Sequence, residues 1–166
     1  MKKKKKKMRL LCFLILSVLI GLSILQTTIN NCGDLQNIKN NLNATYELAN
    51  DFNCSSLPNF EPIGNISFPF TGMLDGKGYS VSNLTVEYIF NDAGIMGVGS
   101  GCLVKDLILK DIKVISSNSG VASLFGSLYN SNVSNIQITT SDANGINHIT
   151  ATGMNNSVGG LVIFLM

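Results

Sequence analysis

Residues 70–86 read FTGMLDGKGYSVSNLTV, and this stretch decides the predicted fold. Asp75 followed by Gly76 is typical of a hairpin turn or a chain corner, because glycine adopts positive φ angles without steric cost. The residues around the turn alternate as strand residues do, with Phe70 before it and Tyr79 after it. We therefore expect short strands punctuated by a turn.

The same stretch comes close to the phosphate-binding P-loop pattern. Three residues separate Gly72 from the Gly-Lys pair where the pattern needs four, and Gly78 stands where a magnesium-binding Ser or Thr belongs. A strand is expected after the loop, so no helix N-terminus would face a phosphate. A second glycine-rich segment, GVGSG at 97–101, lacks the third glycine of a dinucleotide fingerprint. Both segments are interpreted as turns.

Beyond residue 70 the sequence repeats itself. Short strands that begin with Asn or Asp are expected at 83–86, 106–109 and 135–138, with steps of 23 and 29 residues. Small and apolar phrases recur at 93–97 (AGIMG), 122–126 (ASLFG) and 159–162 (GGLV), with steps of 29 and 37 residues. Such spacing is typical of stacked repeats, in which each unit buries its apolar face against its neighbours. A β-solenoid is predicted, and an irregular β-sandwich is the alternative.

Upstream of the repeats, DLQNIKNNL at 34–42 predicts a short helix. Leu35, Ile38 and Leu42 share one face, and Asp34 is the expected N-cap. The apolar face of this helix could cover the first coil. Alternation through ATYELANDFNC predicts a half-buried strand next, and three prolines predict a loop over 55–69.

These repeats resemble the GLUG motif of bacterial and some eukaryotic surface proteins. AGIMG, ASLFG and VGGLV are similar to its Gly-Leu-aromatic-Gly core, and FTGMLDGKGYSVSNLTV is the most specific part of a resemblance that covers residues 34–162. It implies a right-handed β-helical module of a secreted or cell-surface protein, often adhesive or attached to a larger enzyme. The motif has no established catalytic residues. The chain departs from it at Met96, where an aromatic is usual, and at its last phrase, which lacks the closing glycine.

The N-terminus has the layout of a secretory signal. Lys2–Lys7 and Arg9 precede sixteen uncharged, mostly apolar residues at 10–25. A cleaved signal peptide or an uncleaved signal anchor would place residues 26–166 outside the cell. The expected organisation is a signal or anchor at 1–25, a polar connector at 26–33 and the solenoid module at 34–166.

Composition excludes some partners. From residue 26 onward the chain has five lysines, no arginine and ten acidic residues, which gives a net charge of −5. Nucleic acid needs clustered cations, so no nucleic-acid partner is expected. Cys32 and Cys54 could form a disulfide, with Cys102 left free, and no C-x-x-C pair suggests zinc.

Asn-x-Ser/Thr sequons mark candidate glycosylation sites. Six sequons occur, and the three favoured here start at Asn43, Asn65 and Asn132. Asn83, Asp106 and Asn135 begin the three similar strands, and equal positions of stacked coils lie above one another. We therefore expect these three side chains to form a ladder at a corner, which would tie up the sequon at Asn83.

Candidate catalytic groups are few. His148 is the single histidine, and Asp106 with Asp111 is the best pair of carboxylates for glycan cleavage. Calcium ligands could come from Asp51, Asp75 and Asp92, although no D-x-D-x-D-G loop is present. Neither catalysis nor a cofactor is expected.

We therefore predict a non-catalytic, secreted or membrane-tethered module that presents a face to glycans or proteins. An open C-terminal coil would pair with another chain or continue into further repeats. The alternatives are a fragment of a polysaccharide-active β-helix enzyme, for which Asp75, Asp106 and Asp111 would have to gather, and a truncated remnant without function.

Overall fold

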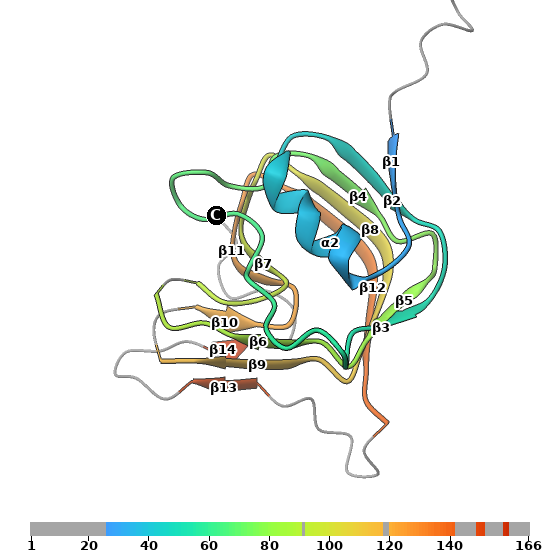
Figure 1. The fold of residues 1–166 in the computed structure, drawn as a ribbon. Coiled ribbons are helices and arrows are strands. Elements are labelled where there is room, and N and C mark those ends of the chain that lie inside the picture. The colour runs from blue at the N-terminus through green and yellow to red at the C-terminus, as the bar shows by residue number, and fades with distance from the viewer. Residues whose placement is uncertain (1–25, 91, 118–119, 142–148, 152–157, 160–166) are drawn as a thin grey trace, which may run out of the picture.

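The computed structural model describes residues 26–90, 92–117, 120–141, 149–151 and 158–159. These residues form a mainly β structure, a β-solenoid in which strands of successive coils lie side by side (Figure 1). All the strand pairs among them are parallel. The predicted β-solenoid is therefore confirmed. The predicted signal segment at 1–25 lies outside the described residues.

The largest sheet forms one wall of the solenoid. Its strands are β1 (Gln26–Ile29), β2 (Thr45–Leu48), β3 (Phe52–Asn53), β4 (Met73–Asp75), β5 (Ser80–Ser82), β8 (Leu103–Lys110) and β12 (Asn132–Thr139). The long strand β8 pairs with β4 along its first half and with β5 along its second half, and β12 pairs along its other edge. One long strand therefore replaces two short strands of the preceding coil.

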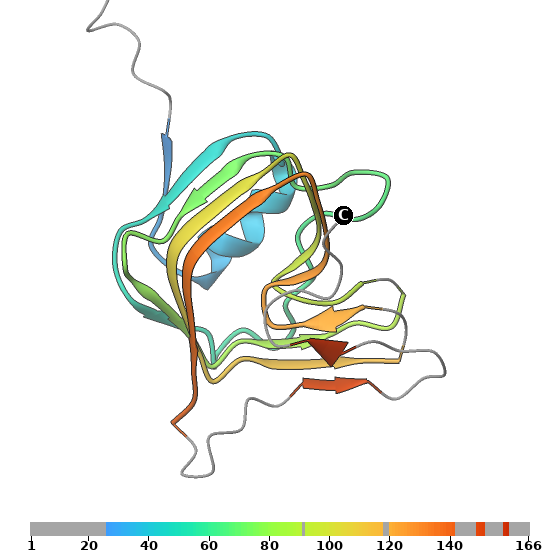
Figure 2. The same cartoon turned by 180° about the vertical axis from the view of Figure 1, so that it is seen from behind.

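Three smaller sheets complete the walls. They contain β6 (Thr85–Glu87) with β9 (Lys113–Ser116) and β13 (Ile149–Ala151), β7 (Met96–Ser100) with β11 (Phe125–Tyr129), and β10 (Val121–Ala122) with β14 (Val158–Gly159). Figures 1 and 2 show these sheets around a common interior. Inward side chains from all the walls share one core, whose largest fully buried members are Phe60, Phe70 and Phe125.

Strand register gives the length of a coil. Thr45 pairs with Met73, Met73 with Leu103, and Leu103 with Asn132, which are steps of 28, 30 and 29 residues. Met96 pairs with Phe125, so the phrases AGIMG and ASLFG occupy equal positions as predicted. The 37-residue step from Ala122 to Gly159 also matches the predicted phrase alignment.

The 23-residue step between the first two predicted strands is wrong. Ser82 pairs with Lys110 and Thr85 with Lys113, so Asn83 lies opposite Asp111 rather than Asp106. The local signature of Asn or Asp followed by Leu or Ile recurs at different corners of one coil. A match between such signatures does not identify equal positions in successive coils.

The predicted helix is present, but it begins and ends two residues earlier than expected. It consists of α2 (Cys32–Asn37) and a 3-10 turn, η1 (Ile38–Asn40), and it lies across one end of the solenoid (Figure 1). Leu35 and Ile38 are 1% and 0% exposed and belong to the common core. The helix therefore caps the core as expected.

The N-cap is Asn31 rather than Asp34. The side-chain oxygen of Asn31 accepts a hydrogen bond from the Asp34 amide at 3.0 Å. The Asp34 carboxylate in turn accepts from the amide of Asn30 at 2.9 Å. Two otherwise unpaired amides are thus satisfied in a reciprocal arrangement like that of a capping box.

The polar connector predicted at 26–33 is instead structured. Residues 26–29 form β1, which pairs in parallel with β2, and the helix begins at residue 32. Ile29 is the one buried residue of β1, so the strand has too little apolar alternation to be recognised in the sequence. Among the described residues, no helix is long and apolar enough to cross a membrane.

Candidate functional site

The Asp-Gly-Lys-Gly loop is a turn within one wall. β4 before it and β5 after it both run parallel to β8, so a hairpin at this loop is wrong and a local turn is right. The amide of Tyr79 donates to the carbonyl of Gly76 at 2.8 Å. The positive φ angles fall on Lys77 (53°) and Gly78 (79°) rather than on Gly76.

Gly76 is needed for contact with the next coil. A Cβ at this position would lie 2.6 Å from the Cα of Leu107. Because the atom in the way belongs to the backbone, no side-chain movement could relieve the clash. The Gly76 amide donates to the carbonyl of Lys105 at 2.8 Å, and the Gly78 amide to that of Asp106 at 2.7 Å. The glycines therefore serve coil stacking, and the loop amides are not free to bind a phosphate.

A charged row crosses the outside of the same wall. Glu47, Asp75 and Lys105 occupy paired positions on β2, β4 and β8. The Asp75 carboxylate accepts from Lys105 Nζ at 2.7 Å and from the Lys77 amide at 2.9 Å. Lys77 Nζ also lies 3.3 Å from the Glu47 carboxylate. Two acids thus occupy neighbouring positions in the row, and the ammonium groups of Lys77 and Lys105 compensate their charges.

Contacts within the row shift the pKa values of its acidic and basic side chains. Burial alone would raise the pKa of Asp75, whose side chain is 6% exposed, but the Lys105 ammonium and the Lys77 amide leave it lowered overall. Hydrogen bonds to Asp75 and Asp106 raise the pKa of Lys105. These groups are therefore ionised around neutral pH.

The distances bear on the enzyme alternative. Lys105 Nζ lies 2.7 Å from an Asp75 oxygen and 2.9 Å from an Asp106 oxygen, so these oxygens are at most 5.6 Å apart. Carboxyl groups about 5–5.5 Å apart occur in retaining glycosidases, in which one carboxyl must be protonated to act as the acid. Hydrogen bonds from Asn135 and Lys105 lower the pKa of Asp106, and that of Asp75 is lowered too. Neither carboxyl is suited to donate a proton.

The predicted corner ladder divides into two. Asn135 Nδ2 donates to Asp106 Oδ1 at 2.7 Å, which joins equal positions of β12 and β8. Asn83 lies at a different corner, opposite Asp111. The two pairs, Asp106 with Asn135 and Asn83 with Asp111, all have φ between 52° and 54°. Asn and Asp adopt such angles more readily than other residues with a Cβ. Backbone geometry thus explains why the signature recurs.

Other acids also join coils. The Asp51 carboxylate accepts from the amide and hydroxyl of Ser80 at 2.7 and 3.0 Å. Asp111 does the same with Ser141, 30 residues further along, and backbone and side-chain hydrogen bonds from Ser141 lower the pKa of Asp111. The predicted Asp106–Asp111 pair therefore has separate partners, and a recurrent Asp-to-Ser spacing of 29–30 residues was the signal that sequence reasoning missed.

The acids considered for calcium do not gather. Asp92 accepts from the Gly120 amide at 3.0 Å and from Ser127 Oγ at 2.6 Å. Asp51 bonds to Ser80 and Asp75 to Lys105, as described above. In the described part of the chain, no three His, Cys, Asp or Glu side chains cluster as metal ligands would. His148 lies outside that part.

The cysteines divide as the sequence suggested. Cys32 of the cap helix and Cys54 of the first coil form a disulfide with a Cα–Cα distance of 5.6 Å. Cys102 is a buried free thiol whose Sγ lies 3.3 Å from Ser131 Oγ. Burial raises the pKa of the Cys102 thiol, which suits a structural position rather than a reactive one.

The favoured sequons have different surroundings. Asn43 and Asn132 are exposed, the second of them on β12. Asn65 is half-buried, and its Oδ1 accepts from the amides of Ser67 and Phe68 at 3.0 and 2.9 Å. The loop that carries Asn65 is thus folded around that side chain. The sequon at Asn155 lies outside the described residues.

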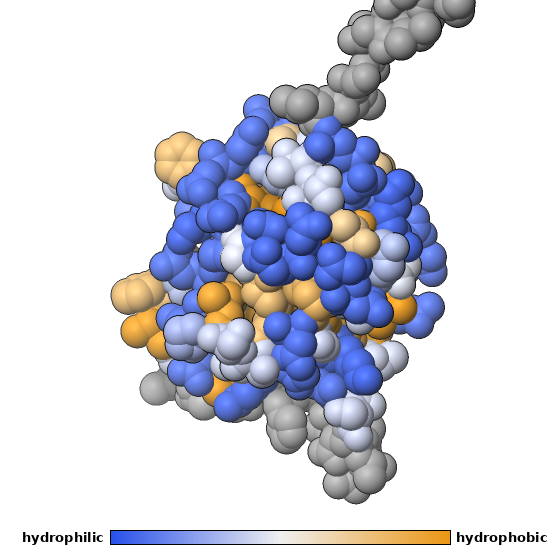
Figure 3. Space-filling model, turned by 45° about the vertical axis from the view of Figure 1, so that its right-hand side comes forward, coloured by the Kyte–Doolittle hydropathy of each residue, from blue (hydrophilic) through white to orange (hydrophobic). Residues whose placement is uncertain are grey.

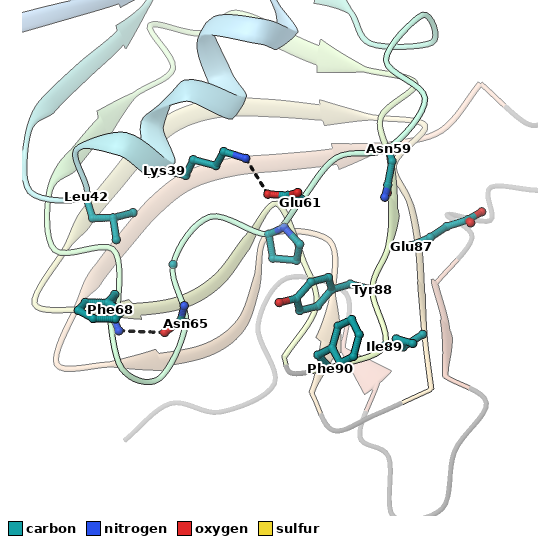
Figure 4. A pocket seen from close by; sticks show the side chains of 12 residues that line it. Lys39, Leu42, Asn59, Glu61, Asn65, Phe68, Glu87, Tyr88, Ile89 and Phe90 are labelled. Atoms are coloured by element: carbon teal, nitrogen blue, oxygen red, sulfur yellow. Dashed lines mark hydrogen bonds and ion pairs between the residues drawn. The ribbon is translucent and has the colours of Figure 1, made fainter.

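An open groove of about 730 Å³ lies beside the cap helix (Figure 4). Its walls are the end of the helix, the proline-rich loop and the segment that follows β6. The lining residues are Lys39, Leu42, Asn59, Glu61, Pro62, Gly64, Asn65, Phe68, Glu87, Tyr88, Ile89 and Phe90. Sequence analysis missed this groove because its residues come from three segments without a common periodicity.

Polar groups tie the proline-rich loop to the cap helix. Lys39 Nζ lies 2.6 Å from a Glu61 carboxylate oxygen. The Gln36 side chain accepts from the Glu61 amide at 2.8 Å and donates to its carbonyl at 2.9 Å. One wall of the groove is therefore fixed to the helix.

Exposed apolar side chains stand on both sides of the groove. Phe68 on one side and Phe90 on the other are 70% and 68% exposed, and Ile89 is 59% exposed. The rings of Tyr88 and Phe90 meet edge to face, with centroids 5.9 Å apart. Figure 3 shows apolar groups that protrude at the left edge of a largely hydrophilic face, and further apolar groups across its middle.

The geometry defines a class: a helix-capped parallel β-solenoid with polar side chains joining its coils and an aromatic groove at the capped end. The chain is similar to halomucin of Haloquadratum walsbyi, with 34% identity over 152 residues. The match spans 80% of this chain and 2% of halomucin, so it concerns a small segment of that protein. No family model matches the chain, and no solved structure matches it.

Proposed function

We propose that this protein is a structural β-solenoid displayed outside the cell, where its outer surface contacts glycans or other proteins. The observation that carries the proposal is the in-register stacking of coils 28–30 residues long. Each coil bonds to the next through backbone and side chains, so the fold is a rigid, extendable scaffold. A scaffold of this kind suits spacing and presentation.

The similarity to halomucin supports the extracellular part of the proposal. The name of halomucin describes a mucin-like protein, and the match covers 80% of this chain. The basic and apolar N-terminus would deliver residues 26–166 across a membrane and, if uncleaved, hold them there. Display at the surface, adhesion and the GLUG assignment are parts of this proposal.

The carboxylate geometry favours a non-catalytic role. Asp75 and Asp106 are close enough for glycoside hydrolysis, but both have lowered pKa values and share the Lys105 ammonium. An enzyme of the polysaccharide-cleaving type would need one of them as a proton donor. The ion cluster instead stabilises coil stacking. We propose neither a cofactor nor a nucleic-acid partner.

The proposal is tested by surface accessibility. The full chain, carrying an epitope tag after Met166, is produced in intact cells, and the tag is detected with an antibody before and after permeabilisation. We expect the antibody to detect the tag without permeabilisation. Protease added to intact cells should remove the tag. A cytoplasmic protein provides the control for intact membranes. Detection only after permeabilisation would contradict surface display.

A further inference from the structure

We propose that the groove beside the cap helix binds a neutral carbohydrate by stacking sugar rings on Phe68 and Phe90. This inference rests on the proposed function and names the ligand class of one surface. Four features of the groove support it: the exposure of the two rings, the polar lining groups without a partner, the charge of the groove and its rigidity.

The two phenylalanine rings form the apolar part of the site. Both are about two-thirds exposed, although they come from segments more than 20 residues apart and line one groove. The C–H face of a pyranose is apolar and slightly electropositive, and it fits the electronegative face of an aromatic ring. Two such rings lining one groove suit a ligand that is apolar on its faces and polar around its rim.

Polar groups without a partner also line the groove. Among the described residues, the side chains of Asn59 and Glu87 make no hydrogen bond or ion pair, and both line the groove. The Asn65 amide nitrogen also has no partner there, because the bonds of that side chain are made through Oδ1. These donors and acceptors match the hydroxyl groups of a sugar, which both donate and accept.

The charge of the groove selects among glycans. Lys39 and Glu61 neutralise each other at 2.6 Å, and Glu87 is the remaining ionised group of the lining. The groove therefore carries one net negative charge, which disfavours sulfated or uronic sugars and the phosphates of lipids. Among glycans, a neutral oligosaccharide is not repelled by this negative charge.

The site stands on a rigid frame. The Gln36 side chain holds Glu61 through two hydrogen bonds, and the Cys32–Cys54 disulfide holds the cap helix to the first coil. A volume of about 730 Å³ lies within the 300–1,000 Å³ typical of small-ligand sites. Preorganised walls reduce the entropy that a ligand must overcome on binding.

Binding is measured on the full chain, purified in mild detergent, with neutral oligosaccharides of glucose, mannose, galactose and N-acetylglucosamine. Isothermal titration gives affinities, and saturation-transfer NMR identifies the sugar protons that touch the protein. Phe68→Ala and Phe90→Ala should each weaken binding by about 3- to 10-fold. Ile66→Ala is the matched control, because Ile66 is 68% exposed and lies on the same loop but does not line the groove.

The expected result is saturable binding of at least one neutral sugar, loss in both Phe variants and less than a twofold change in the control. The proposal is overturned if no neutral sugar binds up to about 10 mM, if acidic oligogalacturonate binds better, or if Ile66→Ala weakens binding as much. Surface detection of the same variants separates the two proposals. Variants that reach the surface normally while the wild type binds no sugar would refute the site alone.

Discussion

Asp75 was a candidate for calcium binding and for catalysis, but in the structure its carboxylate joins neighbouring coils. Asp75 pairs with Glu47 of the preceding coil and with Lys105 of the following coil. Its carboxylate forms ion pairs with the ammonium groups of Lys77 and Lys105. Hydrogen bonds to charged groups contribute about 1.5–3 kcal/mol when they are well shielded. The ion cluster therefore ties neighbouring coils together at the site of the Asp-Gly-Lys-Gly turn.

Asp75→Asn should lower the free energy of unfolding at pH 7 by about 1–2 kcal/mol, toward the low end because Lys105 keeps Asp106 as a partner. The pKa of Asp75 is lowered from 3.8 in the folded state. Its stabilisation is present above pH 3.8 and is lost as pH falls through the lower, folded value. Denaturant unfolding from pH 7 to pH 2 should show a shallower pH dependence in the variant.

Glu87→Gln provides the control for this prediction. Glu87 is exposed and has no ion pair among the described residues, so its removal should leave both stability and pH dependence nearly unchanged. An Asp75→Asn variant as stable as the wild type at pH 7 would contradict a stabilising role for the cluster. A pH dependence identical to that of the wild type would contradict the lowered pKa.

At the scale of the element, the cap helix carries out a task that the repeats cannot. Leu35 and Ile38 close the end of the core, and the disulfide between Cys32 and Cys54 joins the cap to the first coil. The helical spacing of the apolar residues made the cap predictable. β1 was not, because its pairing depends on the edge of β2, which is created only when the first coil forms.

Removing the disulfide should loosen the cap and destabilise the whole fold. The bridge closes 22 residues, for which the chain-entropy model gives about 3 kcal/mol. Cys32→Ser with Cys54→Ser should therefore lower the free energy of unfolding by roughly that amount. The change is measured by thermal and denaturant unfolding in the absence of reductant.

Cys102→Ser is the matched control, since it replaces a free thiol and leaves the bridge intact. Dithiothreitol should destabilise this single variant and have no effect on the double variant. Equal stability of the double variant and the Cys102→Ser variant without reductant would contradict the role assigned to the bridge.

At the scale of the molecule, the sequence predicted the solenoid but not its full register. The phrases AGIMG and ASLFG aligned correctly because the paired position in each coil must hold a buried apolar side chain, as Met96 and Phe125 show. The strands beginning at Asn83 and Asp106 were misaligned because several corners of one coil require positive φ. The groove was missed because it forms only when the loop, the helix end and β6 meet.

The stacked register is the central claim, because the scaffold and the groove both depend on it. Lys110 pairs with Thr139 on the outside of β8 and β12, and neighbouring strands lie about 4.8 Å apart. Lys110→Cys with Thr139→Cys, in a Cys102→Ser background, should therefore oxidise to a disulfide, since Cα distances of about 4.4–6.8 Å permit one.

Lys110→Cys with Gln137→Cys is the out-of-register control, with an expected Cα distance of about 8 Å. Peptide mapping by mass spectrometry after mild oxidation of the folded chain is the direct measurement. The account predicts rapid and complete bridging of residues 110 and 139, with little bridging of residues 110 and 137. Equal yields from the two pairs, or bridging of the second pair alone, would contradict the stacked coils.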